Sequence, residues 1–142
     1  MKDIQDAGNA AEMPGWESYD EPNIFMLHVG PLWTRMVDGW PEYAFRASRH
    51  HLNLNGVVHG GMLTAFADHA LGHAVWTDNG GGGVVTAHLA LNFVAAARMG
   101  DLVACRVEIV RKTRALYFPR GDLMAGDRCI ATASGVWKIL SA

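Results

Sequence analysis

The sequence has few charged residues and few cysteines, and each shortage excludes some classes of protein. Only 18% of its 142 residues are charged, and the formal net charge at pH 7 is −2. A chain without a basic excess offers no general case for binding nucleic acid or an anionic membrane surface. The two cysteines, Cys105 and Cys129, form no CxxC pair and no disulfide framework, which is typical of a reducing compartment.

Long apolar runs and a leader-like beginning are also missing. The longest apolar stretch, residues 62–76, contains Asp68, His69 and His73, so we do not expect it to span a membrane. Residues 1–6 lack the apolar segment of a signal peptide. We therefore expect a soluble cytoplasmic protein.

Apolar residues, by contrast, make up 50% of the chain. This is enough for a folded core, and the length suits one domain. Because a small domain has much surface for its volume, part of the apolar surface is expected to be buried between subunits.

The first 22 residues differ from the rest of the chain. They contain six acidic residues and a single lysine, together with scattered glycine and proline. This composition predicts an acidic, poorly ordered N-terminal arm over residues 1–22 and a single domain over residues 23–142.

Hydrophobic periodicity predicts an α+β domain. Alternating apolar positions, with β-branched and aromatic residues, indicate six strands. These are residues 28–38, 42–50, 84–95, 101–112, 114–125 and 128–140. A helix over residues 60–76 is apolar around nearly its whole circumference, which is typical of a buried helix. The order of elements predicts a curved antiparallel sheet wrapped around this one central helix.

The segment from Asn53 to Asp68 carries the residues best suited to chemistry. His59, Gly60 and Gly61 form a strand-to-helix turn, where glycine lets the backbone approach a ligand. The first helical N–H groups lack intrahelical partners and lie at the positive end of the helix dipole, so they can bind a carbonyl oxygen that becomes an oxyanion. The glycines could equally form only a tight loop, and the turn alone does not decide.

Asp68 lies in the most apolar stretch of the chain. A carboxylate there is costly unless it is bonded or used, and an acid in a dry site can serve as general base or nucleophile. An exposed position at a gap in the apolar surface is the alternative. Asp68 comes eight residues after Gly60, about 12 Å along the helix, so the two cannot reach one carbonyl within one chain. If they serve one site, Asp68 comes from an antiparallel second copy in a two-fold dimer.

Asn53, Gly56, the triplet of residues 59–61, and Asp68 together resemble the hotdog-fold acyl-CoA thioesterases of the phenylacetate-pathway type, within the 4-hydroxybenzoyl-CoA thioesterase superfamily. The resemblance covers roughly residues 23–140. It includes Phe25 and Gly30 in the first strand, residues 67–72 in the helix, Thr86, Asn92 and Phe93 in the next strand, and the turn at Gly100 and Asp101. It implies the hotdog fold, with a sheet wrapped around a helix.

The resemblance also implies roles for the site residues. Asp68 would be the general base or nucleophile, and the Gly60 N–H would polarise the thioester carbonyl. Asn53 would position the water or the thioester, His59 would support the turn and the leaving sulfur, and Thr86 would hold the water. The family pattern takes Asp68 and Thr86 from one subunit and Asn53 and Gly60 from the other. The expected assembly is a homodimer that pairs again into a homotetramer, with acyl-CoA as substrate and no cofactor.

Three alternatives stay open. A hotdog protein that binds acyl-CoA without cleaving it would need no base at residue 68. A hotdog enoyl-CoA hydratase or dehydratase would match the spacing of Asp68 and His73, but these side chains point about 140° apart on a helix. His69 and His73 have the spacing of a metal pair, but no glutamate follows the first histidine and no third ligand is identified, so we predict no metal site.

Two further expectations concern the C-terminal half. The basic residues Arg111, Lys112 and Arg114 are candidates for binding the phosphates of CoA, and Gly61 is a further candidate for contact with the substrate. Pro119 interrupts a predicted central strand, where it removes a ladder hydrogen bond, so we expect a bulge at that place.

Overall fold

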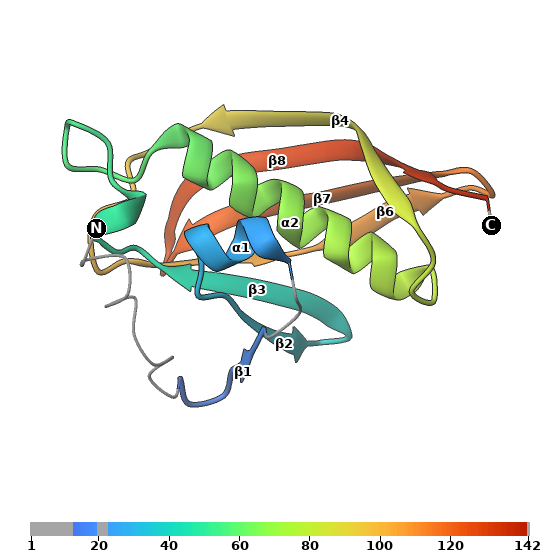
Figure 1. Cartoon of the computed structure of the whole chain (residues 1–142), viewed down its shortest axis with the longest axis horizontal. Helices are drawn as coiled ribbons and strands as arrows, with labels where there is room; N and C mark the ends of the chain where they lie inside the picture. Colours follow the sequence, from blue (N-terminus) through green and yellow to red (C-terminus); the bar gives the residue numbers. More distant parts are fainter. Residues whose placement is uncertain (1–12, 20–22, 142) are drawn as a thin grey trace.

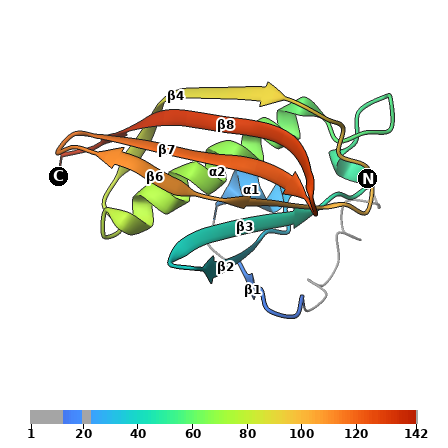
Figure 2. The same ribbon diagram turned by 180° about the vertical axis from the view of Figure 1, so that it is seen from behind.

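One long helix, α2 (Gly60–Asp78), lies across the concave side of an antiparallel sheet. The computed structural model describes residues 13–19 and 23–141. Figure 1 shows α2 in front of the strands, and Figure 2 shows the sheet from behind, with α2 on its far side. The predicted α+β arrangement of a sheet wrapped around one central helix is confirmed. Among the described residues, no helix has both the length and the apolar character needed to cross a membrane.

The sheet of the described residues contains eight strands in place of the six predicted. They are β1 (Glu17–Ser18), β2 (Trp33–Val37), β3 (Trp40–Arg46), β4 (Val84–Phe93), β5 (Leu102–Arg106), β6 (Glu108–Lys112), β7 (Leu116–Ala125) and β8 (Arg128–Ile139). Their order is β1-β2-β3-β5-β7-β8-β4, and β6 pairs with β7. The predicted strand 101–112 is divided because Val107 is fully buried and its N–H donates to the Pro41 carbonyl, outside the regular ladder.

The predicted position of Phe25 and Gly30 in the first strand is wrong. Residues 24–29 form a short helix, α1 (Ile24–Val29), and the first long strand begins only at Trp33. Asn23 caps α1 by accepting a hydrogen bond from the Met26 N–H, and the Gly30 N–H closes the helix on the Met26 carbonyl at 2.8 Å. This local capping overrides the strand-like composition of the segment.

The strand predicted over residues 42–50 is also too long. It ends at Arg46, and the 3-10 helix η2 (Arg49–His51) follows. Within the predicted N-terminal arm, β1 pairs with β2, so part of that segment joins the sheet. Residues 1–12 and 20–22 of the arm lie outside the described residues.

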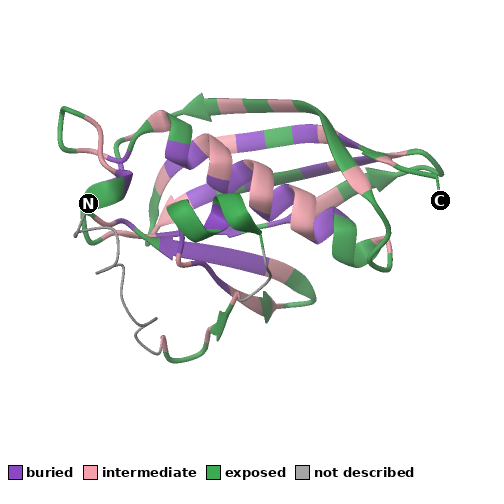
Figure 3. Cartoon of the chain, in the orientation of Figure 1, coloured by how far each residue is buried: buried purple, intermediate pink, exposed green. Residues whose placement is uncertain are grey.

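The core lies between α2 and the sheet. Eight residues of α2 are buried there: Met62, Leu63, Phe66, Ala67, Ala70, Leu71, Ala74 and Val75. The expectation that the helix is buried all round is wrong for a single chain, because a stripe along α2 stays partly or fully exposed. The stripe consists of Gly61, Ala65, Asp68, Gly72 and Trp76. Figure 3 shows this alternation of buried and more accessible positions along α2.

The strand β4 forms one edge of the sheet. Within the described chain it pairs only with β8, so its other edge carries unpaired backbone groups. Most of its residues are exposed, as Figure 3 shows, and Val85 and Phe93 expose 43% and 57% of their surface. A ten-residue exposed edge with apolar side chains is a template for pairing with another strand.

The irregularity expected at Pro119 is present, but in the neighbouring strand. Pro119 is buried in β7 and keeps its place opposite Ile109 of β6. The register of β6 shifts between Ile109 and Arg111, which leaves Val110 as an extra, exposed residue. The strand that faces the missing N–H therefore carries the bulge.

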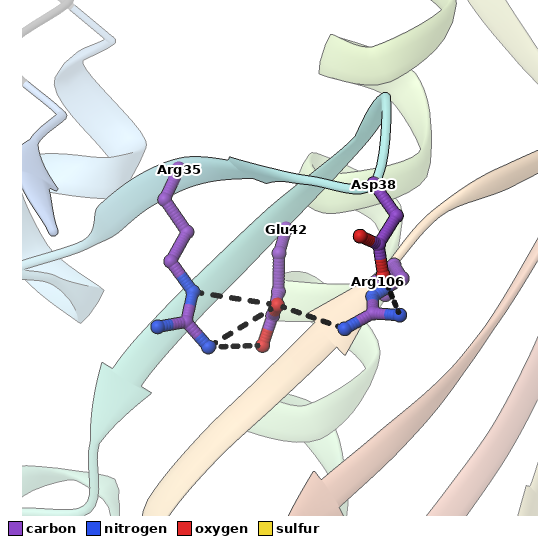
Figure 4. A network of polar contacts seen from close by, with 4 residues as sticks. All are labelled: Arg35, Asp38, Glu42 and Arg106. Carbon is purple, nitrogen blue, oxygen red and sulfur yellow. Dashed lines mark hydrogen bonds and ion pairs between the residues drawn. The ribbon is translucent and has the colours of Figure 1, made fainter. Parts of the chain in front are cut away.

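A charged network holds β2, β3 and β5 together on the outer side of the sheet. Glu42 is 7% exposed and lies between Arg35, at 3.3 Å, and Arg106, at 3.8 Å. Arg106 also approaches Asp38 at 3.9 Å, and Figure 4 shows these four side chains in a row. Because the Glu42 carboxylate is buried while both arginines are partly exposed, the carboxylate depends on its partners more than they depend on it.

Glu42 therefore contributes to stability. We expect Glu42→Ala to lower the free energy of unfolding by about 1–2 kcal/mol, because it removes charge-assisted hydrogen bonds and ion pairs to Arg35 and Arg106 that are formed at a largely buried position. The control is Glu108→Ala. The side chains of Glu108 and its partner Arg120 are both largely exposed, so this substitution should lower the free energy of unfolding by less than about 0.5 kcal/mol. Urea unfolding of both variants checks this, and equal losses would contradict it.

Candidate active site

The segment before α2 folds into a tight turn around Asn53. The Asn53 N–H donates to the Val57 carbonyl, and the Gly56 N–H donates to the Asn53 carbonyl. Gly56 has a φ of +74°, which favours glycine. The side-chain Oδ1 of Asn53 accepts from the backbone N–H groups of Asn55, at 2.9 Å, and Val57, at 3.3 Å. The oxygen is thereby engaged, so Asn53 can offer a ligand only the donors of its Nδ2 group.

His59 caps the start of α2. Its Nδ1 accepts a hydrogen bond from the Gly61 N–H at 2.7 Å. A Cβ on Gly61 would lie 2.8 Å from this Nδ1, so a side chain there would displace the His59 ring. The structure thus gives Gly61 a local reason to be glycine, and its predicted contact with substrate stays a prediction.

The cap determines which N–H group of the helix start is available. The N–H groups of Met62 and Leu63 donate to the His59 carbonyl, and that of Gly61 donates to the His59 ring. Among the described residues, the Gly60 N–H forms no hydrogen bond. It lies at the positive end of the helix dipole and is available to donate a hydrogen bond to a ligand oxygen.

Asp68 and Thr86 lie together, as the resemblance implies. The Thr86 hydroxyl donates to Asp68 Oδ1 at 2.7 Å, and this contact joins the exposed stripe of α2 to the edge strand β4. In a single chain the Asp68 carboxylate is only partly buried. A hydroxyl fixed on one carboxylate oxygen leaves the second oxygen free to take a proton from water or to attack a carbon.

The two halves of this constellation are separated along α2. Gly60 and Asp68 belong to one continuous helix, so they are about 12 Å apart along its axis. One carbonyl cannot lie within reach of both, as the sequence already indicated. If Gly60 and Asp68 serve one site, one chain contains only part of it.

His69 and His73 face away from Thr86. The His73 Nδ1 lies 2.7 Å from the Tyr43 hydroxyl on β3, and the rings of His69 and His73 pack edge-on against Tyr19. Asp68 instead contacts β4. The two side chains that a hydratase would use thus face different sides of α2. Among residues 13–19 and 23–141, no group of three or more histidine, cysteine or acidic side chains is placed to hold a metal ion.

The predicted phosphate-binding residues lie at the other end of α2 from Gly60. Arg111 and Lys112 border a pocket of about 450 Å³ that Trp40 and the last turn of α2 also line. Lys112 is paired with Asp78 at 2.8 Å, and Asp78 also accepts a hydrogen bond from Tyr117. The hydrogen bond from Lys112 lowers the pKa of Asp78. Asp78 therefore already compensates the positive charge of Lys112, which like Arg111 and Arg114 is exposed.

Nothing in the sequence pattern distinguishes His51, yet it links the site to the rest of the fold. It is 2% exposed, its Nδ1 accepts from the Ser48 N–H, and its Nε2 donates to the Val29 carbonyl at the end of α1. The His51 carbonyl accepts from the His59 N–H at 2.8 Å. His51 thus holds α1 and the start of α2 to the same short segment. The sequence could have revealed this role only if it had indicated that the His51 side chain is buried.

A long helix wrapped by an antiparallel sheet, with this turn at the helix start, defines the hotdog fold. The model of the family described as the thioesterase superfamily matches residues 55–129, which is more than half of the chain. The chain therefore belongs to the thioesterase superfamily, and its class of activity is hydrolysis.

Three relatives illustrate the likeness. A Pseudomonas aeruginosa protein named "Putative esterase PA0474" is 33% identical over 97 residues, which cover 68% of this chain and 72% of that protein. A mutant of the phenylacetic acid degradation protein PaaI from Thermus thermophilus is 26% identical, with a TM-score of 0.74 over 83% of this chain and all of that one. A Bacillus halodurans protein solved with CoA is 21% identical, with a TM-score of 0.70 over 77% of this chain and 74% of that one. The resemblance to the phenylacetate-pathway type is thus confirmed.

The buried His51 predicts a pH dependence of stability. Burial lowers its pKa below the ordinary value of 6.5, so the unfolded chain takes up the proton at a higher pH than the folded protein. The contribution of the buried, neutral His51 to the free energy of unfolding is complete above pH 6.5, and it is lost as the pH falls through the pKa of His51 in the folded protein. We expect urea unfolding at about pH 7.5 and about pH 5.5 to show a loss of stability that is smaller in His51→Gln.

The exposed His28 provides the control, because His28→Gln should lose stability as the unsubstituted protein does. A His51→Gln protein with an unchanged dependence on pH would contradict the assignment.

Proposed function

We propose that this protein hydrolyses an acyl-CoA thioester to the free acid and CoA. The observation that carries the proposal is the pair of Asp68 and Thr86, 2.7 Å apart beside a helix whose first N–H, that of Gly60, forms no hydrogen bond among the described residues. These are a base or nucleophile and an oxyanion donor, the two groups that acyl transfer to water requires.

The reaction follows from these groups. With Asp68 as general base, the oxygen of a water attacks the thioester carbon while the carboxylate takes a proton from that water. The carbonyl oxygen gains negative charge and is stabilised by the Gly60 N–H. When the intermediate collapses, the carbon–sulfur bond breaks, and the leaving thiolate takes the proton that Asp68 removed from the water. With Asp68 as nucleophile, a carboxylate oxygen attacks the thioester carbon and the thiolate leaves, which gives a mixed anhydride; water then cleaves the anhydride to the free acid and restores the carboxylate.

The other predicted residues support this chemistry. The Nδ2 group of Asn53 is left to donate to the thioester or to the water, because its oxygen is engaged in the turn. Thr86 orients the carboxylate and can share the attacking water. His59 holds the Gly61 N–H, which leaves the Gly60 N–H as the oxyanion donor.

We also propose that a homodimer completes the site. Two copies of α2, antiparallel along the exposed stripe, would bring Asp68 of one copy to Gly60 of the other and give two identical sites. The small residue Ala65 in the stripe favours a close approach of the helices, and the open edge of β4 favours pairing of the two sheets. A further pairing into a homotetramer is proposed only by resemblance.

The nucleotide end of CoA is assigned to Arg111, Lys112 and Arg114. Antiparallel helices would place the C-terminal end of one α2, where these residues lie, near the Gly60 end of the partner. The CoA complex of the Bacillus halodurans relative supports a CoA ligand for this fold. Because Lys112 is paired with Asp78, the two arginines are the stronger candidates for the phosphates.

The activity is tested by Asp68→Asn. We expect kcat for acyl-CoA hydrolysis, followed by thiol release, to fall by about 10²–10⁴-fold, because the amide keeps the volume but is neither base nor nucleophile. The control, Asp122→Asn, changes an exposed carboxylate on β7 and should retain activity. Near-normal hydrolysis by Asp68→Asn would contradict the proposal, and tight binding of acyl-CoA without hydrolysis by the unsubstituted protein would favour a binding protein.

A further inference from the structure

A second pocket of about 300 Å³ lies directly beside Gly60. It is lined by Val58, Gly60, Leu63, Phe93 and residues 94–97. Every one of these lining side chains is apolar or absent. The pocket therefore has no charged group and no side-chain hydrogen-bonding group with which to hold a polar ligand.

Part of the backbone around the pocket is engaged as well. The N–H groups of Val94 and Ala95 both donate to the Ile130 carbonyl, and the Val58 N–H donates to the Ala97 carbonyl. With the Gly60 N–H assigned to the thioester oxygen, these side chains and engaged N–H groups offer no partner to the amide groups of the pantetheine arm. A hydrocarbon group needs none, so the lining favours the acyl side of the thioester over the pantetheine side.

The position of Gly60 connects this pocket to the reaction. Because Gly60 lines the pocket, a carbonyl oxygen that accepts a hydrogen bond from the Gly60 N–H would lie at its rim, so a substituent of the same carbonyl carbon can enter it. Phe93 forms the opposite wall: a Cβ on Gly60 would lie 3.5 Å from its ring. Phe93 and Val94 expose 57% and 59% of their surface in the single chain, so the wall has apolar area left to cover.

We infer, on the basis of the proposed function, that this pocket takes the acyl group, and that the group is a neutral hydrocarbon. A cavity of about 150 Å³ can hold benzene, so the volume here accommodates an aromatic ring with a short linker or a medium-length aliphatic chain. An acyl group with a terminal carboxylate is excluded, because no cation lines the pocket and an unpaired buried charge is costly.

Ala96 tests the inference because its exposed side chain lines the pocket. Ala96→Phe should lower kcat/KM for phenylacetyl-CoA and octanoyl-CoA at least about tenfold and leave acetyl-CoA within about twofold. The control Ser134→Phe adds the same ring at an exposed position of β8 and should leave all three substrates unchanged. In the unsubstituted protein, succinyl-CoA should be hydrolysed far more slowly than octanoyl-CoA. An equal loss for all three thioesters, no loss for any, or ready hydrolysis of succinyl-CoA would overturn the inference.

A binding measurement tests the acyl pocket independently of the proposed hydrolysis. In the Asp68→Asn background, calorimetry should give a Kd for octanoyl-CoA that rises at least about tenfold on Ala96→Phe, while the Kd for free CoA is unchanged. This result supports the pocket even if no thioester is hydrolysed, whereas an unchanged Kd for octanoyl-CoA overturns it. Ala96→Val, a smaller change with a smaller expected rise, serves as the second variant if thermal unfolding shows that Ala96→Phe is not folded.

Discussion

The account depends on the rigidity of one helix. Because α2 is continuous, the Gly60 N–H and the Asp68 carboxylate are held about 12 Å apart along its axis and cannot meet at one carbonyl. Three other features are explained if a second copy of the chain supplies the group that is missing from each site. The stripe of α2 that includes Asp68 is left partly exposed, β4 has an open edge, and the chain is richer in apolar residues than one small domain needs.

Much of the remaining structure serves to hold the start of α2 in place. The turn at Asn53 engages the oxygen of its own side chain, and His59 engages the Gly61 N–H. His51 connects the same segment to α1, and its burial lowers its pKa. These contacts leave the Gly60 N–H as the one available donor at the helix start within the described part of the chain. A preorganised donor of this kind costs little reorganisation during the reaction.

The sequence predicted what is local and periodic. The helix over residues 60–76 is found at Gly60–Asp78, and Asp68 and Thr86, which the resemblance places in one subunit, lie in hydrogen-bond contact within the chain. The errors arose where a single contact overrides a pattern. The cap at Asn23 turns the segment with Phe25 and Gly30 into a helix.

Other features depend on contacts between distant residues, which spacing cannot show. The pairing of Lys112 with Asp78 joins residues 34 positions apart, and the link from His51 to Val29 joins residues 22 apart. The exposed stripe of α2 was hidden for a different reason. Alanine and glycine count as apolar or neutral when hydrophobic periodicity is assessed. A helix face that packs against a second subunit therefore has the same sequence pattern as a face that is buried in the core of one chain.

The most direct test of the central claim, a site shared between two subunits, is complementation between two inactive variants. Asp68→Asn and Asn53→Ala are each purified, unfolded together and refolded as a mixture, and thioester hydrolysis is compared with each variant alone. If the site is shared, each mixed dimer contains one site with both residues intact, and random mixing restores about a quarter of the original activity. If Asp68 and Asn53 act within the same chain, every site of the mixed dimer carries one defect. A mixture no more active than its two components would contradict the account.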